Sequence, residues 1–232
     1  GQPPAKAEAE INPGAARVPS QLERIQDALL KFDLASIHGT LTESRYLMGA
    51  RGFALDLVTP LMEAVGWMTL SGRITIGHEH ALSAIVRAHL AFMLLEIPRR
   101  KLEPENDDNA FALTTMEGNF HEIGILVASL LCALRGVTNY FLGPNMPVSA
   151  LTEAVVALRA KHVIIGSTSL PPGTLPVAEH DYLFDLDQKL PPFCEIWIGG
   201  PLAGMPDAKL KHKFHFIRTL QEFDQFLTKI AS

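Results

Sequence analysis

FALTTMEGNFHEIG, residues 111–124, is the stretch of this sequence that decides the fold. The apolar and threonine-rich run at 111–116 is typical of a buried strand, and Gly118 and His121 lie in the short segment after it. From Ile123 onward the chain stays apolar over several helical turns. A strand, a glycine-containing loop and a helix in this order predict an α/β sheet, in which ligands bind beyond the carboxyl ends of the strands.

Four further strand-like runs follow this stretch and alternate with helix-like segments. They lie at 137–142, 162–165, 195–198 and 214–217. Such alternation predicts an α/β domain over residues 110–232, with a Rossmann-like (flavodoxin-like) parallel sheet. The loops after the first, third and fourth strands are therefore where we expect a ligand site.

The N-terminal part has a different pattern, in which apolar residues recur at helical spacing from residue 19 to residue 97. We expect a four-helix-bundle cap at residues 19–98, with Gly49 and Gly72 as helix stops. The charged segment 98–109 is interpreted as a domain linker, and residues 1–18 as a linker or chain edge. The expected helices are 20–32, 33–48, 50–70 and 75–97.

Composition excludes several classes of function. A formal charge of −5 and a pI near 6.0 provide no basic surface for nucleic acid, so we expect no DNA binding by this chain alone. Cys132 and Cys194 are far apart and form neither a CxxC metal motif nor a disulfide framework, which favours a reducing, cytoplasmic setting. No stretch reaches the roughly 18 uninterrupted apolar residues of a membrane span, so we expect no membrane contact.

A histidine at the start of a helix is, taken alone, more often a cap or packing residue than a metal ligand. Three loops at one sheet edge change that interpretation for His121. Gly118 and Gly124 allow close approach of the backbone to a bulky ligand, the Gly199-Gly200 pair leaves room for a flat group, and Thr168-Ser169 offers hydroxyls. No second His or Cys lies nearby at ligand spacing, so the imidazole is available to a metal that a cofactor brings in.

These motifs resemble the cobalamin-binding domain shared by methionine synthase, corrinoid methyltransferase partners and light-dependent MerR-type regulators of the CarH/LitR kind. The three motifs occur in order as Asn119-x-His121-x-x-Gly124, Thr168-Ser169-Leu170 and Gly199-Gly200. The resemblance implies a base-off cobalamin with His121 as the lower axial ligand of cobalt. It also implies cofactor contacts from the rest of the first loop, which contains Phe120, Glu122 and Ile123, and from the other two motifs around the displaced base.

One residue departs from the family pattern, because Asn119 occupies a position where many members carry Asp. A carboxylate there raises the basicity of the ligating imidazole, so a neutral amide leaves His121 a weaker donor. We expect ligation to survive with altered cobalt electronics. Glu117 could instead supply the carboxylate, and the sequence leaves both alternatives open.

The helical half resembles the four-helix cap that these proteins place over the upper face of the corrin. The photoreceptor cap carries Trp-x9-Glu-His, and Glu79-His80 matches the end of that motif. Thr69 occupies the position of the motif Trp, whereas Trp67 lies two residues earlier and about 200° away around a helix. The resemblance therefore implies upper-face contacts from Trp67, Thr69, Glu79 and His80 that differ from those of the family.

A second cobalt ligand follows the motif Trp in photoreceptors that form a bis-histidine photoproduct. The matching residue here is Leu70, which cannot bind cobalt. His78 or His80 could substitute, but a Glu-His pair at a helix start also fits a capping arrangement.

The resemblance implies, first, the sensor module of a MerR-type regulator whose DNA-binding domain would precede residue 1. Light would cleave the upper ligand of adenosylcobalamin and change the oligomeric state of a homo-oligomer and its DNA binding. The alternatives are a corrinoid methyl carrier and a photoreceptor with a second, bilin chromophore in the space left by Thr69. No GxGxxG follows the first strand and no catalytic Ser-His-Asp or paired-carboxylate set is present, so we expect no enzyme.

Overall fold

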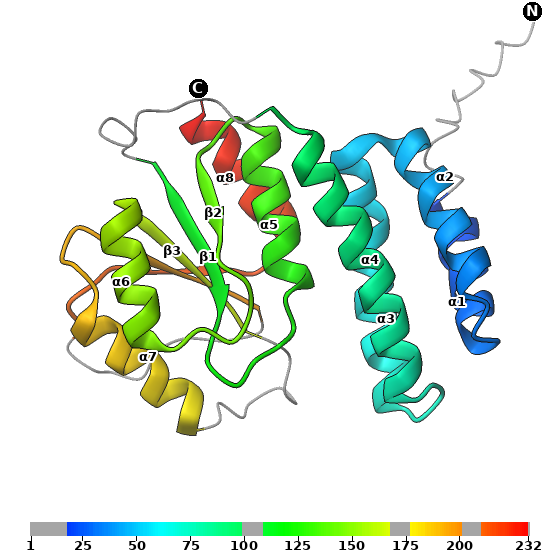
Figure 1. Cartoon of the computed structure of the whole chain (residues 1–232), viewed down its shortest axis with the longest axis horizontal. Coiled ribbons are helices and arrows are strands. Elements are labelled where there is room, and N and C mark those ends of the chain that lie inside the picture. The colour runs from blue at the N-terminus through cyan, green and yellow to red at the C-terminus, as the bar shows by residue number, and fades with distance from the viewer. Residues whose placement is uncertain (1–17, 99–108, 168–176, 201–209, 232) are drawn as a thin grey trace, which may run out of the picture. The chain divides into compact units, whose positions relative to one another are not determined.

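The computed structural model describes residues 18–98, 109–167, 177–200 and 210–231 (Figure 1). The chain divides into two compact units, Gly1–Val86 and Arg87–Ser232, which are described in turn. The expected boundary at 98–110 falls largely on residues outside the described part of the chain and stays a prediction.

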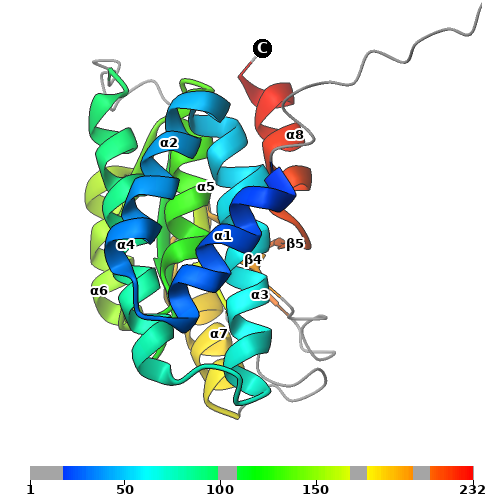
Figure 2. The same cartoon turned by 90° about the vertical axis from the view of Figure 1, so that its right-hand side faces the viewer.

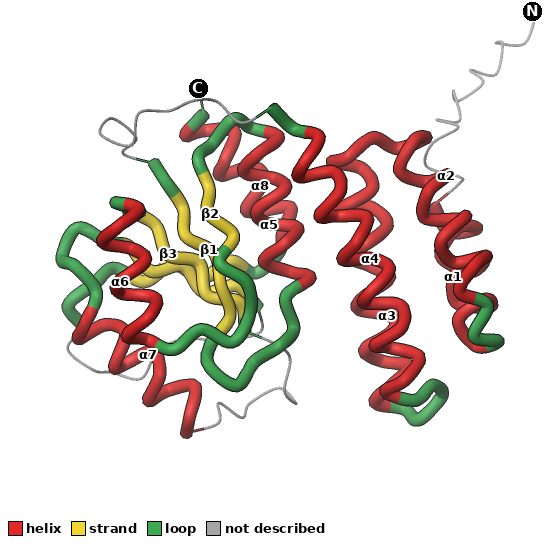
Figure 3. Tube along the Cα trace, viewed as in Figure 1, coloured by secondary structure: helices red, strands yellow, loops and turns green. Residues whose placement is uncertain are grey.

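The first unit is helical, as expected, and Figure 3 shows helices without strands in this part of the chain. In Figures 1 and 2, α1 lies along α2, with which it is in contact. Apolar side chains on one face of each helix are fully buried, among them Ile25, Ile37, Leu61 and Leu82. The helices are α1 (Val18–Leu30), α2 (Leu34–Gly52), the π-helix η1 (Phe53–Val58), α3 (Thr59–Leu70) and α4 (Ile76–Glu96), whose residues after Val86 belong to the second unit.

The expected break at Gly49 is confirmed, although the helical hydrogen bonding continues across it. Gly49 has φ +66° and ψ 171°, which is non-helical and is a conformation that glycine adopts readily. The expected helix 50–70 is present but contains η1. Pro60 explains this widened turn, because proline has no N–H to donate and its ring collides with the carbonyl four residues earlier. The Thr59 hydroxyl donates to the Ala54 carbonyl, 2.9 Å away, and satisfies an acceptor of this segment.

One helical run of the described residues, Leu34–Leu70, is long and apolar enough to cross a membrane by length and composition alone. Buried core helices pass the same test. This run contains the kink at Gly49 and contributes Leu41, Leu57 and Val65 to the core of the first unit.

The second unit contains the predicted parallel sheet. All strand pairs are parallel and their order is β2-β1-β3-β4-β5, which is the flavodoxin-like order. Figure 1 shows α5 and α8 on one face of the sheet and α6 and α7 on the other. The fold class expected from sequence is therefore confirmed. The elements are β1 (Phe111–Thr115), α5 (Ile123–Leu134), β2 (Asn139–Phe141), α6 (Val148–Leu158), β3 (His162–Gly166), α7 (Val177–Lys189), β4 (Glu195–Gly199), β5 (Phe214–Ile217) and α8 (Leu220–Ile230).

Two contacts hold α5 in place in this unit. Gly166 at the end of β3 lies against Ile125, whose Cγ2 would be 2.7 Å from a Cβ at residue 166, so the helix approaches the sheet closely only because this residue is glycine. Arg135 at the end of α5 donates two hydrogen bonds to the buried Asp224 carboxylate of α8, at 3.0 and 2.9 Å. The end of the helix that begins near His121 is thereby tied to the C-terminal helix.

Candidate functional site

The strands of the sheet end level with one another, and this places three loops at one edge. Thr115 of β1 pairs with Gly166 of β3, Gly166 pairs with Gly199 of β4, and Gly199 pairs with Ile217 of β5. Because the strands are parallel, the loops after β1, β3 and β4 all leave the sheet at its carboxyl edge. This is the edge at which doubly wound sheets bind ligands.

The loop between β1 and α5 carries His121, and its backbone is held by its own side chains. The Asn119 Oδ1 accepts a hydrogen bond of 3.0 Å from the His121 backbone N–H, which forms an Asx turn. Gly118 has φ +84°, a conformation that a side chain would disfavour. His121 and Phe120 are exposed, and α5 begins two residues later at Ile123. The imidazole is thus presented to solvent at the head of a helix, as predicted.

The last residue of this loop, Glu122, is mostly buried and forms an ion pair with Arg87, which belongs to the same unit. The Arg87 Nε lies 2.5 Å from the Glu122 Oε1. Gly124 lies in the first turn of α5, and a Cβ there would meet no atom of the described residues within 4 Å. The carboxylate beside His121 is therefore already paired with a cation.

Sequence reasoning missed the loop after β2, which holds the His121 loop from the side. Asn145 in that loop accepts a hydrogen bond from the Gly118 N–H at 2.7 Å and donates its own N–H to the Thr115 hydroxyl at 2.8 Å. Thr115 in turn donates to the Asn119 carbonyl. The turn composition around Gly143, Pro144 and Asn145 was the available signal, but it acquires meaning only because β2 is the neighbour of β1.

The two glycines after β4 have different roles. A Cβ at Gly199 would meet no atom of the described residues within 4 Å. Gly200 has φ +121°, and a Cβ there would lie 2.3 Å from the Ser167 carbonyl oxygen. Gly200 therefore allows the chain just after β4 to pass close to Ser167, the residue just after β3, whereas Gly199 makes no such close approach.

The third predicted motif, Thr168-Ser169-Leu170, lies outside the described residues. The residue before it, Ser167, donates its backbone N–H to the Gly199 carbonyl at 2.7 Å. Its hydroxyl lies 3.5 Å from Glu179 of α7. Partial burial raises the pKa of the Glu179 carboxyl, and the hydrogen bond from Ser167 opposes that rise.

The cap residues of α3 lie in the first unit. Trp67 and Leu70 are 73% and 74% exposed, so α3 ends with two large apolar side chains in solvent. Thr69 is half-buried and donates its hydroxyl to the Val65 carbonyl at 3.0 Å. The residue at the motif Trp position is thus engaged with its own helix, and the aromatic ring two residues earlier is exposed.

Glu79 and His80 lie in the first turn of α4, but the capping contacts come from their neighbours. Thr75 donates its backbone N–H to the His78 Nδ1 at 3.2 Å, and its hydroxyl lies 2.8 Å from the same nitrogen. The His78 ring also contacts Phe32, with ring centroids 3.7 Å apart. His78 therefore contributes a cap to α4, and Glu79 lies in the first turn, where an acidic residue suits the helix dipole. Glu79 is half-buried and His80 is exposed.

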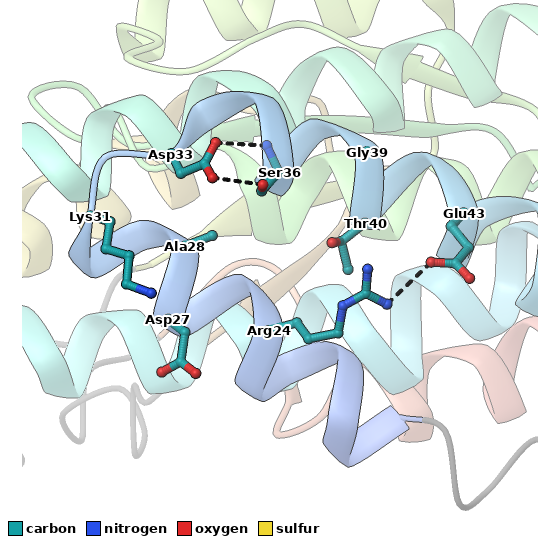
Figure 4. A pocket seen from close by; sticks show the side chains of 9 residues that line it. All are labelled: Arg24, Asp27, Ala28, Lys31, Asp33, Ser36, Gly39, Thr40 and Glu43. Atoms are coloured by element: carbon teal, nitrogen blue, oxygen red, sulfur yellow. Dashed lines mark hydrogen bonds and ion pairs between the residues drawn. The ribbon is translucent and has the colours of Figure 1, made fainter.

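An open groove between α1 and α2 is lined by polar residues and is separate from all predicted site residues (Figure 4). Arg24 and Glu43 form an ion pair across it at 3.3 Å, and Asp33 caps α2 by accepting from the Ser36 N–H at 3.0 Å. These contacts account for three of its charged side chains, those of Arg24, Asp33 and Glu43. No group of three or more His, Cys, Asp or Glu side chains that could hold a metal occurs among the described residues.

Comparisons with known proteins bear on the helical region and on the fold. Residues 21–93 match a family model described as B12 binding domain. The chain is 32% identical over 148 residues to the HTH-type transcriptional repressor CarH of Myxococcus xanthus, a match that covers 64% of this chain and 46% of the relative. It thus spans about half the length of that relative. The expected resemblance to CarH-like regulators is confirmed.

A solved structure also shares the fold. The monomethylamine corrinoid protein of Methanosarcina barkeri matches with a TM-score of 0.65 and 15% identity, over 91% of this chain and 99% of that chain. At this identity the likeness concerns the fold, which combines a helical region with a Rossmann-like domain.

Proposed function

We propose that this chain is the cobalamin-binding sensor module of a transcriptional regulator, with residues 19–98 as the cap and 110–232 as the lower, Rossmann-like domain. DNA would be bound by a domain that lies outside this chain, because the net charge of −5 offers no basic surface for it. The regulator would be a cytoplasmic homo-oligomer of the MerR type, without enzymatic activity of its own. The similarity to the CarH repressor and to the B12 binding domain supports this proposal.

The observation that carries the proposal is the presentation of His121. Its imidazole is exposed on a hydrogen-bonded loop at the carboxyl edge of a parallel sheet. No metal-binding cluster surrounds it among the described residues, so it suits a metal that arrives with its other ligands in a cofactor. Among the described residues, no atom lies within 4 Å of a Cβ placed at Gly124 or Gly199, which supports a large planar group at the same edge.

The residues around His121 would bind and orient cobalamin rather than react with it. Phe120, Glu122 and Ile123 flank the ligand, and Asn119 fixes the backbone at His121. Gly199, Gly200 and the motif Thr168-Ser169-Leu170 would accommodate the displaced nucleotide base. Bound adenosylcobalamin would supply a light-sensitive cobalt–carbon bond.

The cap would cover the upper face through Trp67, Thr69, Glu79 and His80. Leu70 cannot replace a lost upper ligand, so the spectrum after illumination should lack a bis-histidine signature unless His78 or His80 takes that role. Loss of the upper group would leave the exposed apolar residues at the end of α3 without their contact. The resulting change in the cap would alter oligomeric state and DNA binding.

Two alternatives have an observation in their favour. The fold of a corrinoid protein supports a methyl carrier, in which His121 would tune cobalt nucleophilicity. The exposed Trp67 and Leu70, with Thr69 bonded to its own helix, support an additional flat apolar ligand such as a bilin. Methyl transfer to a partner enzyme would favour the first alternative, and a red-absorbing pigment after expression with biliverdin the second.

The deciding experiment is the absorption spectrum of the protein with adenosylcobalamin before and after green light, with sizing chromatography of each sample. The wild type should show a base-off, histidine-ligated spectrum that His121→Ala loses. His38→Ala, at an exposed histidine of α2, is the matched control and should behave as the wild type. A light-induced change of spectrum and assembly supports the sensor, a light-independent spectrum favours the carrier, and absence of binding refutes the proposal.

A further inference from the structure

The loop after β2 is attached to the His121 loop because the strand order places β2 beside β1. Met116, just after β1, forms a parallel bridge with Met146. The Met146 N–H donates to the Thr115 carbonyl at 3.1 Å. Backbone pairing thus continues beyond the ends of the two strands, and the two loops begin as one structure.

Asn145 makes the contacts that reach furthest into the His121 loop. Its N–H lies 3.0 Å from the Asn119 carbonyl oxygen and 2.8 Å from the Thr115 hydroxyl oxygen. Its side-chain Oδ1 accepts the Gly118 N–H at 2.7 Å. Asn145 has φ +60°, a left-handed conformation that Asn tolerates better than most residues. Only the Oδ1 contact depends on the identity of the side chain.

The loop that carries Asn145 is itself anchored. The Tyr182 hydroxyl of α7 donates to the Met146 carbonyl at 2.8 Å. Tyr182 is buried, and burial together with the nearby Glu117 raises the pKa of its hydroxyl, so this donor keeps its proton. A continuous series of contacts therefore runs from α7 through Met146 and Asn145 to Gly118, three residues before His121.

We infer that Asn145 is a positioning residue for His121, which holds the β1–α5 loop in its ligating geometry before cobalamin binds. The inference rests on the proposed function, because it assigns a role in cobalt ligation to a residue outside the three motifs. Gly118 has φ +84°. Once its N–H has lost the Asn145 acceptor, the backbone at this glycine can adopt other conformations. Loss of the Asn145 oxygen would therefore widen the range of positions that the imidazole samples, and the fraction of molecules ready to ligate cobalt would fall.

The test compares Asn145→Gly with Asn145→Asp. Glycine keeps the positive φ and removes Oδ1, whereas aspartate keeps an acceptor at the same position. In the protein without cofactor, Asn145→Gly should speed amide hydrogen exchange at Gly118 by about fivefold, the effect of one lost hydrogen bond. With cobalamin, the same variant should bind about fivefold more weakly and show a smaller histidine-ligated fraction at saturation. Asn145→Asp should restore both readouts.

Each outcome separates the inference from the proposed function. If the wild type has a histidine-ligated spectrum and Asn145→Gly matches it in affinity and ligated fraction, Asn145 is not a positioning residue. Equal defects in Asn145→Gly and Asn145→Asp would also refute the role of the Oδ1 acceptor. A wild type without a histidine-ligated spectrum would instead refute the proposed function, while hydrogen exchange would still show whether Asn145 holds the loop.

Discussion

Gly200→Ala should destabilise the second unit strongly, while the same substitution at the adjacent Gly199 should not. At Gly200 an alanine would have φ +121°, in a region that costs about 1–3 kcal/mol for a residue with a Cβ. Its Cβ would also lie 2.3 Å from the Ser167 carbonyl oxygen. Relief of such an overlap by movement of the backbone costs a further ~1–3 kcal/mol.

The sum is a loss of about 2–6 kcal/mol in the free energy of unfolding, or roughly 5–20 °C in melting temperature for a chain of this size. The assay is thermal and urea unfolding of the protein without cofactor, followed by circular dichroism. Gly199→Ala is the internal control, since its Cβ would meet no atom within 4 Å and its φ is not positive. Equal unfolding temperatures for the two variants would refute the assignment of Gly200 to loop packing.

The control has a second use, because an added methyl at Gly199 would occupy the open space at the sheet edge. Gly199→Ala should fold normally and bind cobalamin more weakly than the wild type. Unchanged affinity would show that the displaced base does not lie beside Gly199.

The remaining predictions concern buried charges. Asp224→Ala should cost about 1.5–3 kcal/mol, because it removes the hydrogen bonds between a carboxylate that is 2% exposed and Arg135, whose side chain is 31% exposed and is then solvated in part. Chemical denaturation would measure this loss. Asp185→Ala, from the exposed pair with Lys189, is the control and should change stability by less than ~1 kcal/mol. Burial lowers the pKa of His162 to about 4, and its Nδ1 accepts the Trp197 indole N–H at 3.2 Å, which requires the neutral ring. The unfolded chain binds this proton near pH 6.5 and the folded chain only near pH 4, so stability should decline as pH falls through that window, by at most ~1.4 kcal/mol per pH unit. His162→Gln should flatten this part of the stability profile, and an unchanged slope would assign it to other groups.

The strands and helices were predictable from local pattern. The run at 111–116 was expected to be a buried strand, and every residue of β1 is buried. The alternation of strands and helices was sufficient to predict a parallel sheet, whereas the register that brings the ends of β1, β3 and β4 level is seen only in the structure. The interruption of the third helix was not predicted, although Pro60 was visible, because a periodic apolar pattern does not reveal how a helix accommodates proline.

The candidate site was predictable only in part. Exposure of His121 at the head of a helix follows from a strand, a short loop and an apolar run, all local features. The hydrogen bonds by which Asn145 holds that loop could not be predicted, because they form only when β2 is the neighbour of β1. Likewise, the sequence suggested one role for Gly199 and Gly200 together, whereas the structure distinguishes them by the position of the Ser167 carbonyl.

By itself the sequence determined where the strands and helices lie and at which edge of the sheet the loops after β1, β3 and β4 begin. These depend on periodicity and on the order of elements along the chain, which are local properties. The tertiary structure alone decided the partner of each polar group, as with Arg135 and Asp224, which are 89 residues apart. The physical reason is that hydrogen bonds and steric contacts depend on distances of a few ångströms between distant segments, and these distances are determined by the packing of the whole unit.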